Sequence, residues 1–421
     1  MTIKFKNRVD FFCVLFITIT LFFPLFDSSL YFGFLLITSV LFVLVALLFY
    51  ERSQITVGSE YLIFLTFLFL FWLFTLFFYV YVSIFNNLKT SFADTLEFIK
   101  LPYYAAVSFF FYFSLSQRPK ITKDLFFIFF FVVALLGIVS LFSDSVALFY
   151  TSSKLVRWGR LCAPFINPYT FAFCISFFVL WFYLEVTIGE LSNGKRFYYF
   201  FLFSIALILL FLTQSRSSIF SVILVLFLSP IFLLIFFSRK KRREFKIRLW
   251  KASIFGIVAS VVFYYAIYFL ELTYTTTLVE QLTGQQEFTN DSVNVRIQQL
   301  SKLTGYLIDI PFSIIGGFGP AKNEFKLLES GYAYILFRHG LIGLLIYLTL
   351  FVFLFLFALK KATEMKSPFY LAISLYIFSF PLLLSSSMHI EHPKASFFFA
   401  IIIGALLAEY RERKSSQYFR K

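Results

Sequence analysis

Long apolar segments separated by short polar connections dominate the chain. A membrane-crossing helix needs about 20 mainly apolar residues, and by this measure the pattern predicts about twelve such helices. Their approximate cores are residues 11–26, 30–50, 61–82, 98–116, 124–143, 164–186, 197–213, 217–237, 252–271, 332–359, 368–387 and 393–410. The sequence therefore predicts an all-α fold, a polytopic transmembrane helical bundle forming one integral membrane domain over residues 1–421.

One polar stretch, Glu271–His339, breaks this pattern. Within it we predict a large external loop over residues 272–331, far longer than the connections that usually join neighbouring helices. Apolar residues at near-helical spacing predict a short helix, Val295–Leu307, ended by Asp309-Ile310-Pro311. The following turn, Gly316-Gly317-Phe318-Gly319-Pro320, is expected to need unusual backbone angles.

The seventh and eighth predicted helices are separated only by Thr213-Gln214-Ser215-Arg216-Ser217-Ser218. This short polar segment is compatible with a tight turn between two helices or with one broken helix.

Basic residues predict the orientation of the bundle. They gather in alternate connections and in the C-terminal tail, and positive residues hold such segments in the cytoplasm. The basic connections are residues 117–123, 193–196, 238–251 and 360–366. Both termini are therefore expected in the cytoplasm, and the large loop on the opposite, periplasmic or extracytoplasmic, side.

Composition agrees with this class. Hydrophobic residues make up 60% of the 421 residues, charged residues 14%, and the mean hydropathy is +0.86. The net charge of +15 does not indicate nucleic acid, because the basic residues cluster at helix ends. Three scattered cysteines and three histidines show no metal or disulfide spacing, so no metal or cofactor is expected.

External arginines are the first candidates for chemistry. Arg160 precedes the helix start Asn167-Pro168, Arg296 opens the loop helix, and Arg338 lies just inside the tenth predicted span. An arginine near a helix end commonly reaches for the membrane interface. Arg216 differs, because it lies in a very short external turn among hydroxyl residues. The tendency of positive residues to lie in the cytoplasm does not explain an arginine there. Several such guanidinium groups together would form a metal-free clamp for phosphate.

Acids and histidines form the second group. Glu329, with Glu324 before it, lies where the tenth predicted span begins, and is either a helix cap or, if partly buried, a base. His339 is expected about two turns into that helix, as a packing or substrate-binding residue. His389 and His392 resemble a metal pair only loosely, and a solvated loop is the favoured interpretation.

Together these residues resemble Wzy-type O-antigen or capsule repeat-unit polymerases, and more broadly the O-antigen ligase superfamily. The stretches that carry the resemblance are Arg160 to Pro168, Thr213 to Arg216, Arg296 with Pro311 and Gly316 to Gly319, and Glu329-Ser330 followed by Gly340-Leu341-Ile342-Gly343. The resemblance covers about residues 155–350 by motif and the whole chain only by topology.

The resemblance implies a glycosyltransferase of the bacterial inner membrane. A sugar hydroxyl of one undecaprenyl-diphosphate-linked glycan would attack the anomeric carbon of another, and undecaprenyl diphosphate would leave. The residues implied are Glu329, Arg216 and Arg296 for catalysis, Arg160, Asn167, Arg338, His339 and Glu324 for diphosphate or glycan binding, and Gly317 and Gly319 for the loop turn. The implied partners are these lipid-linked glycans, membrane lipids and a chain-length regulator of the polysaccharide co-polymerase type.

Two alternatives remain. O-antigen ligases, which transfer polymer to lipid A–core, place a His-Asn-like pair nine residues before the Gly-x-x-Gly motif. Here that position is Glu329-Ser330, which favours a polymerase. A lipid-linked oligosaccharide flippase also has about twelve helices, but it should carry charges at mid-membrane depth, and here such charges are scarce.

Overall fold

The computed structural model describes the helices and many of their connections. The described residues are 8–23, 28–50, 57–85, 91, 94, 97–117, 119–151, 160–236, 250, 254, 258, 265, 291–321, 328, 330–384, 388 and 392–418. Within these ranges the chain forms helices and no strand, so the all-α prediction is confirmed for the described part.

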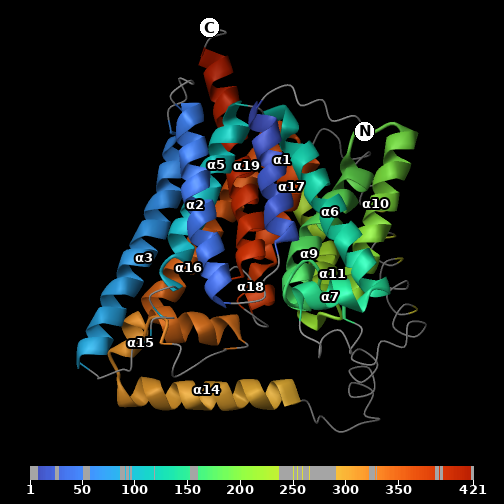
Figure 1. Ribbon diagram of the computed structural model, residues 1–421. Coiled ribbons are helices and arrows are strands. Elements are labelled where there is room, and N and C mark those ends of the chain that lie inside the picture. Colours follow the sequence, from blue (N-terminus) through green and yellow to red (C-terminus); the bar gives the residue numbers. More distant parts are fainter. Residues whose placement is uncertain are drawn as a thin grey trace. The chain divides into compact units, whose positions relative to one another are not determined.

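Figure 1 shows the helices coloured in chain order, from blue at the N-terminus to red at the C-terminus. They are α1 (Arg8–Phe22), α2 (Ser28–Tyr50), α3 (Ser59–Phe85), α5 (Lys100–Gln117), the short 3-10 helix η1 (Pro119–Ile121), α6 (Thr122–Phe142), α7 (Asp144–Tyr150), α9 (Pro168–Ile188), α10 (Asn193–Leu212), α11 (Arg216–Phe236), α14 (Asp291–Asp309), α15 (Ser313–Gly316), α16 (Gly331–Met365), α17 (Pro368–Phe378), α18 (Phe380–Leu384) and α19 (Pro393–Tyr418).

Five of these helices, α3, α6, α9, α10 and α16, are long and apolar enough to cross a membrane. Shorter apolar helical segments add to them: Asp10–Phe22, Leu36–Leu48, Arg216–Phe232, Pro368–Leu384 and Pro393–Ala408. The helical content and these lengths are those of a multi-pass membrane protein. Most of the predicted span 252–271 lies outside the described residues, so the count of about twelve stays a prediction.

The chain divides into two compact units. Unit 1 comprises Met1–Leu136, Arg296–Leu350 and Ser387–Lys421, and unit 2 comprises Gly137–Val295 and Phe351–Ser386. Each unit is described by itself, and the single-domain organisation stays a prediction.

In unit 1, α5 packs between α2 and α19. The ring of Phe42 lies 5.3 Å from that of Phe110, and Phe111 lies 5.6 Å from Phe397. Gly404 lets the backbones of α19 and α5 come together, since a Cβ atom there would lie 2.7 Å from the Cβ of Phe111. The phenylalanine-rich sequence of α5 thus supplies a core on both of its sides.

In unit 2, α9 is the central helix, packed against α10, α11 and α17. Almost every residue of α9 is buried, which explains why its sequence is apolar on all sides. Its polar groups find partners within the unit: Tyr376 donates to the Phe173 carbonyl at 3.0 Å, and Tyr183 pairs with Ser229 at 3.1 Å.

The structure confirms the predicted loop helix and the predicted turn. The helix is α14, which ends at Asp309, two residues before Pro311. Gly317 and Gly319 have φ angles of +77° and +69°, which are conformations that favour glycine. The boundary between the seventh and eighth predicted helices is a tight turn, because α10 ends at Leu212 and α11 begins at Arg216.

The prediction of an unbroken tenth helix was wrong. Gly340 interrupts α16 with φ 62° and ψ −167°. A Cβ atom at Gly340 would lie 2.4 Å from the Ile315 carbonyl oxygen, so the close approach of these two backbones accounts for the break. Arg338 and His339 therefore end a short helical segment instead of lying two turns inside a continuous helix. The predicted span 368–387 is likewise divided at Ser379, between α17 and α18.

Candidate functional site

The glycine-containing turn of unit 1 packs against the backbone of Arg338. Phe318 N donates to the Phe337 carbonyl at 2.7 Å, and Gly319 N donates to the Arg338 carbonyl at 2.9 Å. These carbonyls lie just before the non-helical Gly340, where a helical segment ends, and the turn supplies donors to both. A Cβ atom at Gly317 would lie 2.4 Å from the Arg338 carbonyl carbon, which explains a glycine there.

The side chain of Arg338 belongs to a buried charge cluster formed with Glu97 and Lys100. Arg338 Nη1 donates to Glu97 Oε2 at 3.1 Å and also to the hydroxyl of Tyr334, whose ring lies 4.2 Å from the guanidinium carbon. Lys100 Nζ lies 2.5 Å from the same Glu97 oxygen. The Glu97 carboxylate thus contacts two cations. Such contacts compensate charges that have been removed from water.

The hydrogen bonds around His339 favour one tautomer. Its Nδ1 lies 2.8 Å from the Thr75 hydroxyl, and that hydroxyl donates its one proton to the Phe71 carbonyl at 2.8 Å. With that proton on the Phe71 carbonyl, the Thr75 oxygen accepts from Nδ1–H of His339, and Nε2 carries the lone pair. Among the described residues this buried Nε2 has no hydrogen-bond partner. His339 is thus a fixed acceptor beside Arg338, held by packing against Phe71 at 4.3 Å.

His392 lies near the same charge cluster. It is partly buried, which differs from the solvated position expected for it. The pKa of His392 is lowered to about 4, chiefly by burial and also by the charge of Lys100, while Glu97 opposes the shift. His389 lies outside the described residues, and within the described part no three metal-ligating side chains gather as they would around an ion.

In unit 2, Arg160 fastens the turn that precedes Arg216. Its Nε donates to the Thr213 carbonyl at 3.1 Å, and its Nη2 donates to the Gln214 carbonyl at 3.3 Å. The guanidinium also lies 5.0 Å from the Tyr169 ring centre. Gln214 has a φ of +52°, unusual for a residue with a side chain, and its carbonyl is one of the two that Arg160 holds. The cation therefore satisfies carbonyls at the end of α10 and fixes a constrained turn.

Arg216 is the first residue of α11 and is partly buried. The turn before it is ordered by its own hydroxyl groups, since Thr213 Oγ1 accepts from Ser215 N at 3.2 Å and Ser215 donates to Ser218 at 2.9 Å. Arg216 thus lies at the amino end of a long helix, where N–H groups and the helix dipole favour anions.

Asn167 caps α9. Its Oδ1 accepts from the backbone N of Thr170 at 2.8 Å and from the Thr170 hydroxyl at 2.7 Å. These are the usual hydrogen bonds of an N-cap residue. Pro168 at the first helical position also favours the start of a helix there. The oxygen of Asn167 is therefore engaged in starting the helix.

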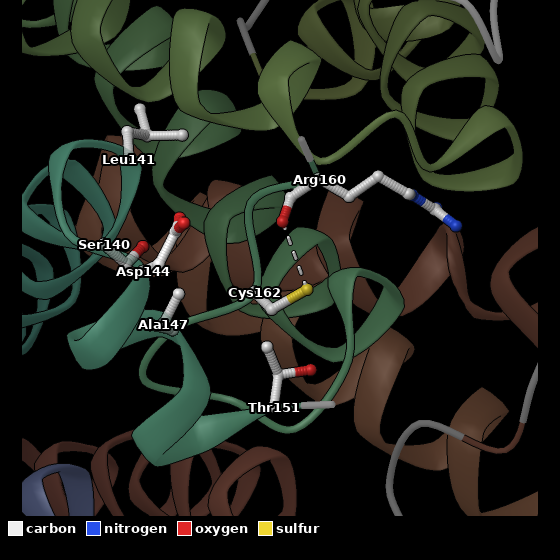
Figure 2. A pocket seen from close by; sticks show the side chains of 8 residues that line it. Ser140, Leu141, Asp144, Ala147, Thr151, Arg160 and Cys162 are labelled. Carbon is white, nitrogen blue, oxygen red and sulfur yellow. Dashed lines mark hydrogen bonds between the residues drawn. The ribbon is translucent and has the colours of Figure 1, made fainter. Parts of the chain in front are cut away.

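A small cavity of about 70 Å³ lies in unit 2 beside Arg160 (Figure 2). Its lining residues are Ser140, Leu141, Asp144, Ala147, Thr151, Arg160, Cys162 and Ala163. The guanidinium of Arg160 points away from the other labelled side chains, while Cys162 Sγ donates to the Arg160 carbonyl at 3.3 Å. Burial raises the pKa of Cys162 to about 12, so it stays a thiol. The cavity is large enough for a few waters but not for a sugar, since ligand sites usually exceed about 300 Å³.

No family model and no curated protein sequence matches the chain.

The structure brings some predicted site residues together within each unit. In unit 1 the turn of Gly317 and Gly319 meets Arg338, and in unit 2 Arg160 meets the turn before Arg216. Glu324, Glu329 and the side chain of Arg296 lie outside the described residues, although the backbone of Arg296 belongs to α14. The convergence of these arginines on one diphosphate stays a prediction.

Sequence reasoning missed Glu97, Lys100, Tyr334 and Thr75. A local signal existed for the first two, because an acid and a lysine three residues apart open the fourth predicted span. Thr75 and Tyr334 gave no signal, since each lies within an apolar run and is identified only by its contact with His339 or Arg338.

Proposed function

We propose that the protein is a polysaccharide polymerase that joins undecaprenyl-diphosphate-linked oligosaccharide repeat units on the outer face of the bacterial inner membrane, in O-antigen or capsule biosynthesis. The observation that carries the proposal is the pair of hydrogen bonds from Arg160 to Thr213 and Gln214. These bonds unite two of the stretches on which the resemblance rests, although 53 residues separate Arg160 from Thr213.

The chemistry of the proposal lies in a diphosphate leaving group. Breaking the anomeric C–O bond places negative charge on that diphosphate, and preorganised cations stabilise the charge as it develops. Arg216 suits this task because its guanidinium can bind two phosphate oxygens and it lies at the amino end of α11. The resemblance assigns a second cation to Arg296, and assigns to Glu329 the orientation or deprotonation of the attacking sugar hydroxyl.

Reconstitution tests the proposal directly. The purified chain in proteoliposomes is given an undecaprenyl-diphosphate-linked repeat unit, and products are separated on a gel. We expect a ladder of lengthening glycans from the parent chain, and no ladder from Arg216→Ala. Lys302→Ala, which removes an exposed cation from α14, is the matched control and should leave the ladder unchanged.

The other outcomes identify the alternatives. Product that forms only when lipid A–core is added indicates a ligase, and movement of the lipid-linked unit without any product indicates a flippase. A full ladder from Arg216→Ala would contradict the part given to this arginine. A chelator should leave the ladder intact, because arginines supply the charge stabilisation in this proposal.

A further inference from the structure

Helix α14 has three distinct sides. At 100° per residue, Leu303 and Tyr306 lie on one side, which faces unit 1. Leu303 is buried, and the Tyr306 ring lies 5.9 Å from Phe318 and 6.4 Å from Phe337. A second side is polar and exposed and includes Lys302. Protein therefore covers only one side of the helix within the described part of unit 1.

The third side is apolar and exposed. Ile297, Leu300 and Ile308 recur at spacings that place them on one flank of the helix, and they are 59%, 54% and 69% exposed. The exposed Thr304 lies on the same flank between Leu300 and Ile308. Isolated exposed aliphatic residues are common on protein surfaces, but three on one flank of a helix indicate a binding surface. The polar flank beside it shows that the helix separates an apolar from an aqueous environment.

The apolar flank continues onto a membrane-spanning surface. After α14 ends, Phe312, Ile314 and Ile315 are also exposed. The Phe312 ring stacks on Phe78 of α3 at 5.8 Å and lies 5.2 Å from Tyr81. Helix α3 is one of the five long apolar helices, and few of its residues are buried. The row on α14 therefore adjoins a surface whose natural environment is lipid.

The direction of α14 agrees with that environment. Figure 1 shows α14 running across the direction of α3, beyond the end at which α3 finishes. Helices that lie in the membrane interface have this orientation, with an apolar face buried about 5–10 Å into the boundary between headgroups and acyl chains.

We infer that α14 is an interfacial membrane helix that inserts Ile297, Leu300 and Ile308 into the adjoining leaflet of the bilayer. The lysine-bearing flank then faces water. The inference rests on the exposed row and its continuity with α3, and it holds whatever reaction the protein catalyses.

Site-directed fluorescence in phosphatidylcholine proteoliposomes tests the inference on the full chain. Leu300→Cys and Lys302→Cys form a matched pair, two residues apart on the same helix, and each is labelled with a polarity-sensitive dye. The three native cysteines are buried, so the unchanged chain treated with the same dye serves as the blank. Quenching is measured with lipids brominated just below the headgroup and, separately, with aqueous iodide.

At position 300 we expect a blue-shifted emission, a strong loss of fluorescence with brominated lipid and little loss with iodide. At position 302 we expect the opposite: strong loss of fluorescence with iodide and little loss with brominated lipid. Ile308→Cys and Gln298→Cys repeat the comparison one turn or more away, which guards against a single substitution that disturbs the fold. Strong iodide quenching at 300 and 308 would overturn the inference in favour of a water-exposed row. Protection of both positions from both quenchers would overturn it in favour of a protein cover.

Discussion

Glu97 compensates the buried Arg338 and the partly buried Lys100, so its replacement should be costly. Its Oε2 lies 3.1 Å from Arg338 Nη1 and 2.5 Å from Lys100 Nζ. At an effective dielectric constant of about 20, Coulomb's law gives attractions of about 5 and about 7 kcal/mol for the two pairs. The side chains of Glu97 and Arg338 are only 5% and 9% exposed, so solvent screens them little. Desolvation offsets much of the attraction, and removing one partner of such a pair costs about 3–5 kcal/mol.

The assay is unfolding of the purified protein by sodium dodecyl sulfate. Glu97→Gln removes the charge with little change in shape, and we expect it to lower the free energy of unfolding by about 3–5 kcal/mol. The double variant Glu97→Gln, Arg338→Gln should lose less than the sum of the two single losses, because the second change removes the cation that the first left uncompensated. Glu190→Gln, at an exposed acid between α9 and α10, is the matched control.

Two results would refute this reasoning. One is a Glu97→Gln protein within about 0.5 kcal/mol of the parent, as expected of an exposed surface change. The other is strict additivity of the two single variants, which would mean that Glu97 and Arg338 do not interact. In either case the orientation of Arg338 would depend on Tyr334 and on the turn at Gly319.

Two further predictions concern backbone strain and pH. Gly317→Ala should destabilise the protein by about 1–2 kcal/mol or more, because of its φ of +77° and the contact with the Arg338 carbonyl. Gly305→Ala, in an open position of α14, should be neutral or stabilising by about 0.5–1 kcal/mol in the same assay. Burial lowers the pKa of His392 from 6.5 to about 4. Between pH 6.5 and pH 4 the unfolded chain therefore binds a proton at this residue that the folded chain does not. Stability should fall by up to about 3 kcal/mol as the pH falls from 6.5 to 4, and His392→Gln should flatten this dependence; an unchanged profile would contradict it.

The helices were predictable because their signal is local. An apolar run of about 20 residues has few alternatives to a helix that crosses the membrane, and nine predicted cores coincide with one uninterrupted described helix each. The break at Gly340 was not predictable in this way. A helix tolerates an isolated glycine, and the close approach of Ile315 that accounts for the break is a tertiary contact.

The candidate site was less predictable than the fold, because its contacts are remote in sequence. Arg338 was identified as a candidate from its place at a helix end, but its acid, Glu97, lies 241 residues earlier. The same holds for His339, whose tautomer depends on a threonine 264 residues away. Sequence spacing shows which side chains are unusual for a membrane helix, whereas only the fold shows which groups they contact.

The arginines of the proposed site divide into two kinds of task. Arg160 already donates two hydrogen bonds, to the carbonyls of Thr213 and Gln214. Its guanidinium points away from the other labelled side chains of the neighbouring cavity (Figure 2). Arg338 is likewise engaged by Glu97 and Tyr334. A diphosphate would compete with these existing bonds at either residue, so both suit the positioning of backbone turns better than the direct stabilisation of a leaving group. In the proposed polymerase the diphosphate is assigned to Arg216 because of its place at the amino end of α11, on the turn that Arg160 fixes.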